Sequence, residues 1–137
     1  MKQSIYLKAI LIFAGVIGIS VGIGQMFFPI AFEASAGINV EGEVSLLSEI
    51  RAAGGTLLIA GIIMFWGAFR HSLSSSALFL AILFYLSYGL SRVYGIIVDG
   101  IPNQSLVIVT ISEITIGLVA YIVYYRLRKK TSSDLKM

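Results

Sequence analysis

The 137-residue sequence predicts an all-α integral membrane protein, with four transmembrane helices packed as an antiparallel bundle in one domain over residues 1–137. Three observations lead to this fold class. Apolar residues make up 58% of the chain and charged residues only 12%, about half the charged share of a typical soluble domain. The apolar residues gather in four runs, each long enough as a helix to cross a hydrocarbon core of roughly 30 Å. The runs do not alternate polar and apolar residues, which disfavours a β-barrel.

The four helices are expected at about residues 6–28, 50–70, 77–98 and 105–126. Pro29 should end the first helix, because its ring cannot continue the backbone hydrogen-bond ladder. The alternative for the first run is a secretory signal peptide with Ala34-Ser35-Ala36 as its cleavage site. A retained spanning helix is favoured, since the run exceeds the roughly 7–15 apolar residues of a signal peptide.

Polar segments flank these helices and set the expected topology. Residues 29–48 are predicted to form an extracytoplasmic loop, residues 72–76 a short turn, and residues 127–137 a basic cytoplasmic tail. Most basic residues lie before the first helix, between the second and third, or after the fourth: Lys2, Lys8, Arg70, Arg126, Arg128, Lys129 and Lys130. Because cytoplasmic segments carry such an excess, both termini are predicted to be cytoplasmic. The net charge of +3 therefore reflects membrane topology, and no nucleic-acid partner is expected.

A row of small residues follows one face of the first helix. Ala14, Gly18 and Gly22 are spaced four residues apart, and Gln25 lies one turn further along. Small residues at this spacing let another helix approach closely. The row is interpreted as a packing face inside the bundle, with a homo-oligomer or partner-subunit interface as the alternative.

Charged residues inside the apolar runs mark the candidate site, because a transmembrane helix carries them only where something compensates them. Arg92 and Asp99 are seven residues apart and share a face of the third helix. Glu113 lies inside the fourth helix, at a depth similar to that of Arg92 if the two helices are joined by a short turn. We therefore predict that Arg92 and Glu113 are in contact or are joined by one polar group.

A single carboxylate leaves donors of a guanidinium unpaired. Tyr88, Gln25 or Asp99 are the candidates to accept from them. Glu49 and Arg51 are expected to add a second pair of opposite charges at the outer rim of the second helix. The full candidate cluster, in the extracytoplasmic half, is Gln25, Glu49, Arg51, Tyr88, Arg92, Asp99 and Glu113.

Other chemistry is weakly represented. Cysteine is absent, so thiolate catalysis and zinc–thiolate sites are excluded. His71 is the only histidine and lies at the basic edge of the membrane, far along its helix from Arg92. Glu41-Gly42-Glu43 offers too few oxygen ligands for a calcium site. No metal site is expected, and no cofactor and no catalytic residue can be identified from the sequence.

With these residues identified, the sequence resembles an uncharacterised bacterial family of small four-helix membrane proteins, domain of unknown function 4345. The resemblance rests on Glu49-x-Arg51-Ala52-x-Gly54-Gly55, on Arg92 with Asp99-Gly100-x-Pro102, and on Glu113. These elements span residues 49 to about 118, and Ser91 stands where a glycine is expected. The resemblance implies a multi-pass protein of the bacterial inner membrane and implies no activity.

Three functions remain open at this stage. The favoured hypothesis is a protein whose outward-facing pocket binds a lipid-like or polar-headed small molecule, with membrane lipids as its surroundings. The second is a structural accessory subunit, in which the polar cluster fixes helix register. The third is a membrane enzyme acting on a lipid or quinone, with Glu113 or Asp99 as proton carrier.

Overall fold

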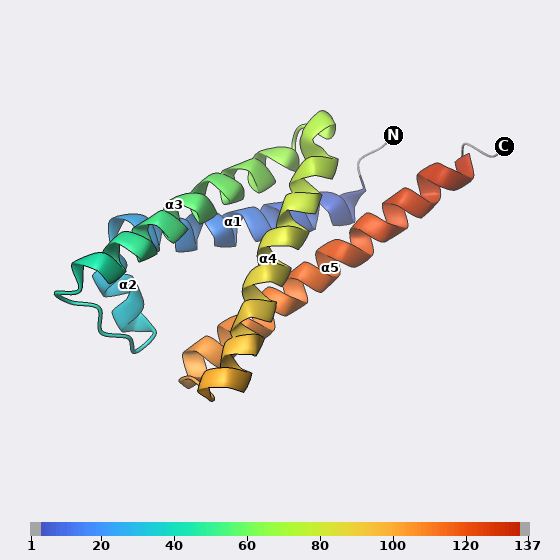
Figure 1. Cartoon of the computed structure of the whole chain (residues 1–137). Helices are drawn as coiled ribbons and strands as arrows, with labels where there is room; N and C mark the ends of the chain where they lie inside the picture. The colour runs from blue at the N-terminus through green and yellow to red at the C-terminus, as the bar shows by residue number, and fades with distance from the viewer. Residues whose placement is uncertain (1–3, 135–137) are drawn as a thin grey trace.

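The computed structural model describes residues 4–134, with side chains up to residue 129. Helices are the only regular secondary structure in this part of the chain: α1 (Ile5–Phe27), α2 (Pro29–Ser35), α3 (Val44–Gly67), α4 (His71–Asp99) and α5 (Gln104–Asp134) (Figure 1). α1, α3, α4 and the Gln104–Lys129 part of α5 are each long and apolar enough to cross a membrane. The prediction of an all-helical multi-pass membrane protein is confirmed, and a fifth, short helix is added.

The predicted loop over residues 29–48 is partly wrong, because it contains α2 and the first turn of α3. Pro29 follows the end of α1 and occupies the start of α2, where its missing N–H and fixed φ are tolerated. The ring of Phe32 lies against Gly24 so closely that a Cβ at Gly24 would overlap it. α2 therefore folds back onto the end of α1.

Two further boundaries differ from the predictions. The serine-rich segment over residues 72–76 is helical, since α4 begins at His71. Ser74 Oγ donates to the carbonyl oxygens of Gly67 (2.8 Å) and Arg70 (3.0 Å), which joins the start of α4 to the end of α3. α5 continues to Asp134, through most of the predicted tail, because Leu127 still packs on the core. Lys2 and the last three residues of that tail lie outside the described residues.

α1 and α3 lie side by side as a tightly packed pair (Figure 1). A Cβ at Gly15 would lie 2.6 Å from Phe65 N, one at Gly22 2.5 Å from Leu58 N, and one at Gly54 2.6 Å from Met26 N. Residue numbers thus fall along α3 as they rise along α1, and only glycine allows these backbones so close. The predicted packing face is confirmed at Gly18 and Gly22, which α3 covers, whereas Ala14 is buried and its carbonyl oxygen accepts a hydrogen bond from Tyr85 of α4.

α4 and α5 form the second pair, which is close at its shared turn and diverges away from it (Figure 1). Near the middle of the two helices, Gly89 packs against Ile114 and Gly117 against Leu86. The buried residues of α5 include Thr110, Gly117 and Ala120, whose spacing places them on one face of the helix.

The two pairs share one hydrophobic core, at the end of the molecule that holds the α3–α4 turn. Its fully buried residues include Leu11, Ala14, Leu78, Ala81 and Ala120. Lys8 Nζ lies 5.8 Å from the centre of the Phe69 ring, and the Phe79 and Tyr124 rings are 6.5 Å apart. The start of α1 and the C-terminal half of α5 therefore lie at this same end (Figure 1).

At the opposite end, the segment between α4 and α5 reaches the segment after α2. Asn103 Nδ2 donates to the carbonyl oxygen of Ala36. Asn103 Oδ1 accepts from the N–H of Leu106 at 3.1 Å, which caps the start of α5. One side chain thus begins α5 and links the two helix pairs.

Candidate functional site

Arg92 of α4 and Glu113 of α5 form an ion pair, as predicted. Arg92 Nε donates to Glu113 Oε2 at 3.0 Å, and the two side chains retain 32% and 14% of their exposure. Among the described residues, Glu113 is the only hydrogen-bond partner of the guanidinium. The two side chains are partly buried, and each charge is neutralised by the other. Charged residues within apolar helices need such a partner.

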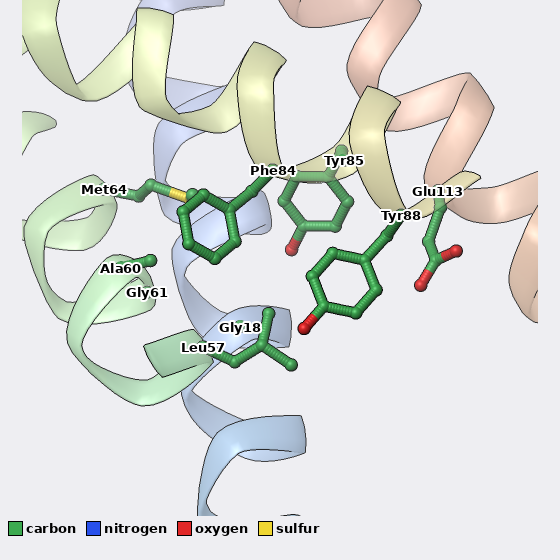
Figure 2. A pocket seen from close by; sticks show the side chains of 9 residues that line it. All are labelled: Gly18, Leu57, Ala60, Gly61, Met64, Phe84, Tyr85, Tyr88 and Glu113. Atoms are coloured by element: carbon green, nitrogen blue, oxygen red, sulfur yellow. The ribbon is translucent and has the colours of Figure 1, made fainter. Parts of the chain in front are cut away.

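A pocket lies between the two helix pairs, beside this ion pair. It is a partly open hollow, and its empty space of about 280 Å³ includes space open to the surroundings. All four long helices line it: Gly18 of α1, Leu57, Ala60, Gly61 and Met64 of α3, Phe84, Tyr85 and Tyr88 of α4, and Glu113 of α5 (Figure 2). The pocket lies beside the close contact of α1 and α3, where a Cβ on Gly61 would lie 2.5 Å from Ile19 N, and aromatic residues of α4 line its other side. Its wall is apolar except for the tyrosine hydroxyls and one carboxylate.

The two tyrosines of the pocket differ in what their hydroxyls bind. Tyr85 is buried, and its hydroxyl donates to the carbonyl oxygen of Ala14 at 2.6 Å, so it ties α4 to α1. Tyr88 is half-buried, and its hydroxyl has no hydrogen-bond partner among the described residues. Figure 2 shows the Tyr88 hydroxyl directed toward Leu57, with the Glu113 carboxylate beside the ring. The Tyr88 hydroxyl is therefore free to bind a molecule in the pocket.

The remaining predicted residues lie elsewhere. Gln25 Nε2 donates to Glu33 Oε1 at 3.3 Å, and Gln25 Oε1 is buried without a partner among the described residues. Arg51 Nη1 donates to the backbone carbonyl of Met26, in the last turn of α1. Gln25 and Arg51 thus stabilise the corner of α1, α2 and α3.

Glu49 and Arg51, which were predicted as a second pair of opposite charges at the rim, form no ion pair with each other, since the only ion pair among the described side chains joins Arg92 to Glu113. A carbonyl at a helix C-terminus carries partial negative charge, so Met26 can take the place of the carboxylate. Glu49 and Asp99 are exposed. Neither Asp99, Tyr88 nor Gln25 accepts a hydrogen bond from Arg92. The seven predicted residues therefore form two groups, one at the pocket (Tyr88, Arg92 and Glu113) and one at the corner (Gln25 and Arg51). The exposed carboxylates Glu49 and Asp99 belong to neither group.

Sequence reasoning found Tyr88 and Glu113 but missed the apolar wall of the pocket. Leu57, Met64 and Phe84 resemble any lipid-facing side chain in a helix that is apolar all round. Gly18 and Gly61 indicate a close approach of two helices and not a pocket, because a Cβ on Gly18 would lie 3.1 Å from Gly61 Cα. No pattern within a single helix therefore marked the apolar wall.

The described side chains offer no cluster of three histidine or acidic residues that would hold a metal ion. His71 is exposed, at the end of the molecule opposite Asn103. What surrounds the pocket is a carboxylate, a free hydroxyl and apolar groups, which suits the binding of an amphipathic molecule.

Comparison with known proteins places the chain by its sequence. Neither a curated protein nor a solved structure matches it. One family model matches residues 6–124, which covers α1 through most of α5 and includes every residue of the pocket. The chain therefore belongs to the family described as Domain of unknown function (DUF4345).

Proposed function

We propose that this protein is a small multi-pass protein of the bacterial inner membrane that binds a lipid-like or polar-headed small molecule. The observation that carries the proposal is the partly open pocket between the helix pairs, whose apolar wall ends at a carboxylate and a free tyrosine hydroxyl. Pockets for small molecules are commonly apolar with a few placed polar groups. A charged pair retained at membrane depth is, by default, the mark of a functional site.

The proposal includes an orientation in the membrane. The four long helices form an antiparallel bundle, with both termini and the α3–α4 turn in the cytoplasm. The basic residues at that end support this orientation. Cysteines introduced at Glu41 and Ser75, both exposed, should react with a membrane-impermeant reagent only from opposite sides. Labelling of both from outside intact cells would refute it.

The ligand is proposed to enter from the outer leaflet, between α3, α4 and α5. Glu113 and Tyr88 belong to the part of the bundle nearer the Asn103 end, and the shared core fills the other end. α4 and α5 are also the pair that diverges. A molecule with an apolar tail would reach the pocket from the bilayer without crossing the aqueous phase.

The proposal is tested by native mass spectrometry of the protein extracted in mild detergent. Leu57→Trp fills the pocket from α3 and should abolish retention of a co-purifying molecule. Ile59→Trp is the matched control, since Ile59 is two residues away, 63% exposed and outside the pocket wall, and it should retain the molecule. Circular dichroism must show the same helix content in both variants.

Two results would contradict binding at this site. One is a wild-type protein that carries no small molecule in any mild detergent. The other is retention of the molecule by Leu57→Trp. Either result would favour the accessory-subunit hypothesis, in which the Arg92–Glu113 pair only holds α4 against α5.

A further inference from the structure

We infer that the end of the bundle that holds the α3–α4 turn binds the phosphate groups of anionic phospholipids in preference to zwitterionic lipids. Three features of this end support such binding: its charge, the way two of its cations are held, and its position on the spanning helices. None of its basic side chains lines the pocket, so this binding is separate from the proposed function and does not depend on it.

The charged side chains of the protein are divided between the two ends of the bundle. Toward the Asn103 end, carboxylates lie on α2, on the segment before α3, near the start of α3 and on the last residue of α4. The opposite end, which we call the basic end, holds no described carboxylate, and its described cations are Lys8, Arg70, Arg126, Arg128 and Lys129. None of these forms an ion pair, since the only ion pair among the described side chains joins Arg92 to Glu113. The basic end therefore has positive charge that an anionic partner would neutralise.

Two of these cations are held by aromatic rings. Lys8 Nζ lies 5.8 Å from the centre of the Phe69 ring, and Arg128 Cζ lies 5.6 Å from that of Tyr124. A ring attracts a cation to its face by electrostatics, without a conventional hydrogen bond to the N–H groups. Those donors stay available for a phosphate, among the residues that the structure describes. A cation that is already ordered also loses less side-chain freedom when it binds.

The position of the basic end makes a membrane lipid the source of the phosphate. Lys129 ends the part of α5 that can cross a membrane, and Lys8 lies in the first turn of α1. Exposed apolar side chains adjoin these cations, as at Phe69 and Tyr125. Aromatic residues at the ends of spanning helices lie at the level of the lipid head groups, so the cations beside them reach lipid phosphates directly. A nucleic acid or an acidic protein would first have to displace those head groups.

Trp66, the only tryptophan of the chain, serves as the reporter for the test. Its side chain is 55% exposed on α3, one turn before Phe69. The protein is reconstituted in vesicles of phosphatidylcholine and phosphatidylglycerol, in which one lipid at a time has brominated chains that quench a neighbouring tryptophan. Quenching by the two brominated lipids at equal mole fraction gives their relative affinity beside Trp66. Phosphatidylglycerol should be favoured about fivefold for each cation that contacts it. The preference should largely disappear at about 1 M salt, where the Debye length is roughly 3 Å.

Variants identify the cations that are responsible. Lys8 lies against the Phe69 ring and Arg70 follows Phe69 in the chain, so both are near Trp66. Replacement of both by glutamine should bring the ratio of affinities close to one, whereas Lys8→Arg retains the charge and should retain the preference. Glu41→Gln is the control for net charge, because it alters an exposed residue at the Asn103 end and should leave the ratio unchanged.

Three results would refute this lipid preference. One is equal quenching by the two lipids in wild-type protein at low salt. Another is a preference that persists in the double glutamine variant or at high salt, and the salt series decides the question if that variant does not fold. The third is a change in Glu41→Gln as large as that in Lys8→Gln, which would indicate a response to net charge alone. None of these results bears on the pocket, which is tested separately with Leu57→Trp and Ile59→Trp.

Discussion

The close approach of α1 to α3 depends on Gly61, and its replacement by alanine should weaken this pair. An alanine Cβ would lie 2.5 Å from Ile19 N, 2.8 Å from Gly18 C and 2.9 Å from Gly15 O, all of them backbone atoms. Ordinary contact begins at 3.4 Å, so the helices would have to separate by about 0.9 Å. A gap of that size forfeits roughly a quarter to a half of the attraction of each contact along the seam. The expected cost is about 1–3 kcal/mol.

Gly55→Ala is the matched control for this prediction. It lies in the same helix, and the nearest atom to its Cβ would be Met26 Sδ at 3.7 Å, an ordinary contact. Both variants gain the same helix propensity, about 1 kcal/mol, so the difference between them isolates the clash. Unfolding in mixed micelles with increasing SDS, followed by far-UV circular dichroism, measures the two free energies. Equal stability of Gly61→Ala and Gly55→Ala would refute the packing argument.

Two other contacts give tests in the same assay. Arg92→Leu leaves Glu113 without its partner and should cost about 1–3 kcal/mol, between the values for exposed and buried pairs. Adding Glu113→Leu should recover part of that loss, and strict additivity of the two substitutions would show that the pair contributes nothing. Asn103→Asp keeps the cap on α5 but removes the donor to Ala36, whereas Asn103→Ala removes both and should be less stable by about 1 kcal/mol. Equal stability of the two Asn103 variants would show that the cap does not stabilise the protein. An Asn103→Asp variant as stable as wild type would show that the hydrogen bond to Ala36 does not stabilise it either.

The spans and the ion pair were predictable because they follow from rules that act along single helices. Apolar length identifies a spanning helix, and the 1.5 Å rise per residue sets the depth of Arg92 and Glu113. Once two helices are joined by a short turn, charges at equal depth have few other partners. The glycine spacing in α1 likewise identified a close helix contact before its partner was known.

The predictions from sequence were wrong where a residue has more than one possible hydrogen-bond partner or more than one allowed position in a helix. Arg51 was expected in one polar cluster with Arg92 and Glu113, but it donates to the carbonyl of Met26 at the end of α1. Serine was expected to end a helix before residue 77, but Ser74 satisfies its hydroxyl on backbone carbonyls and remains helical. Pro29 was expected only to stop a helix, although the same ring also starts one. Each choice depends on which backbone groups are nearby, and that is settled by tertiary structure.

The pocket depends on the relation between the helix pairs and not on any one helix. Within each pair the helices are in close contact, as at Gly22 and Gly89, so neither pair can change shape cheaply. Between the pairs, the core fills one end and Asn103 provides a hydrogen bond at the other. A change in the angle between the pairs would therefore alter the space between Leu57 of α3 and Tyr88 of α4, which both line the pocket. A molecule that fits this space binds one angle better than others, so its binding and the arrangement of the pairs are thermodynamically linked.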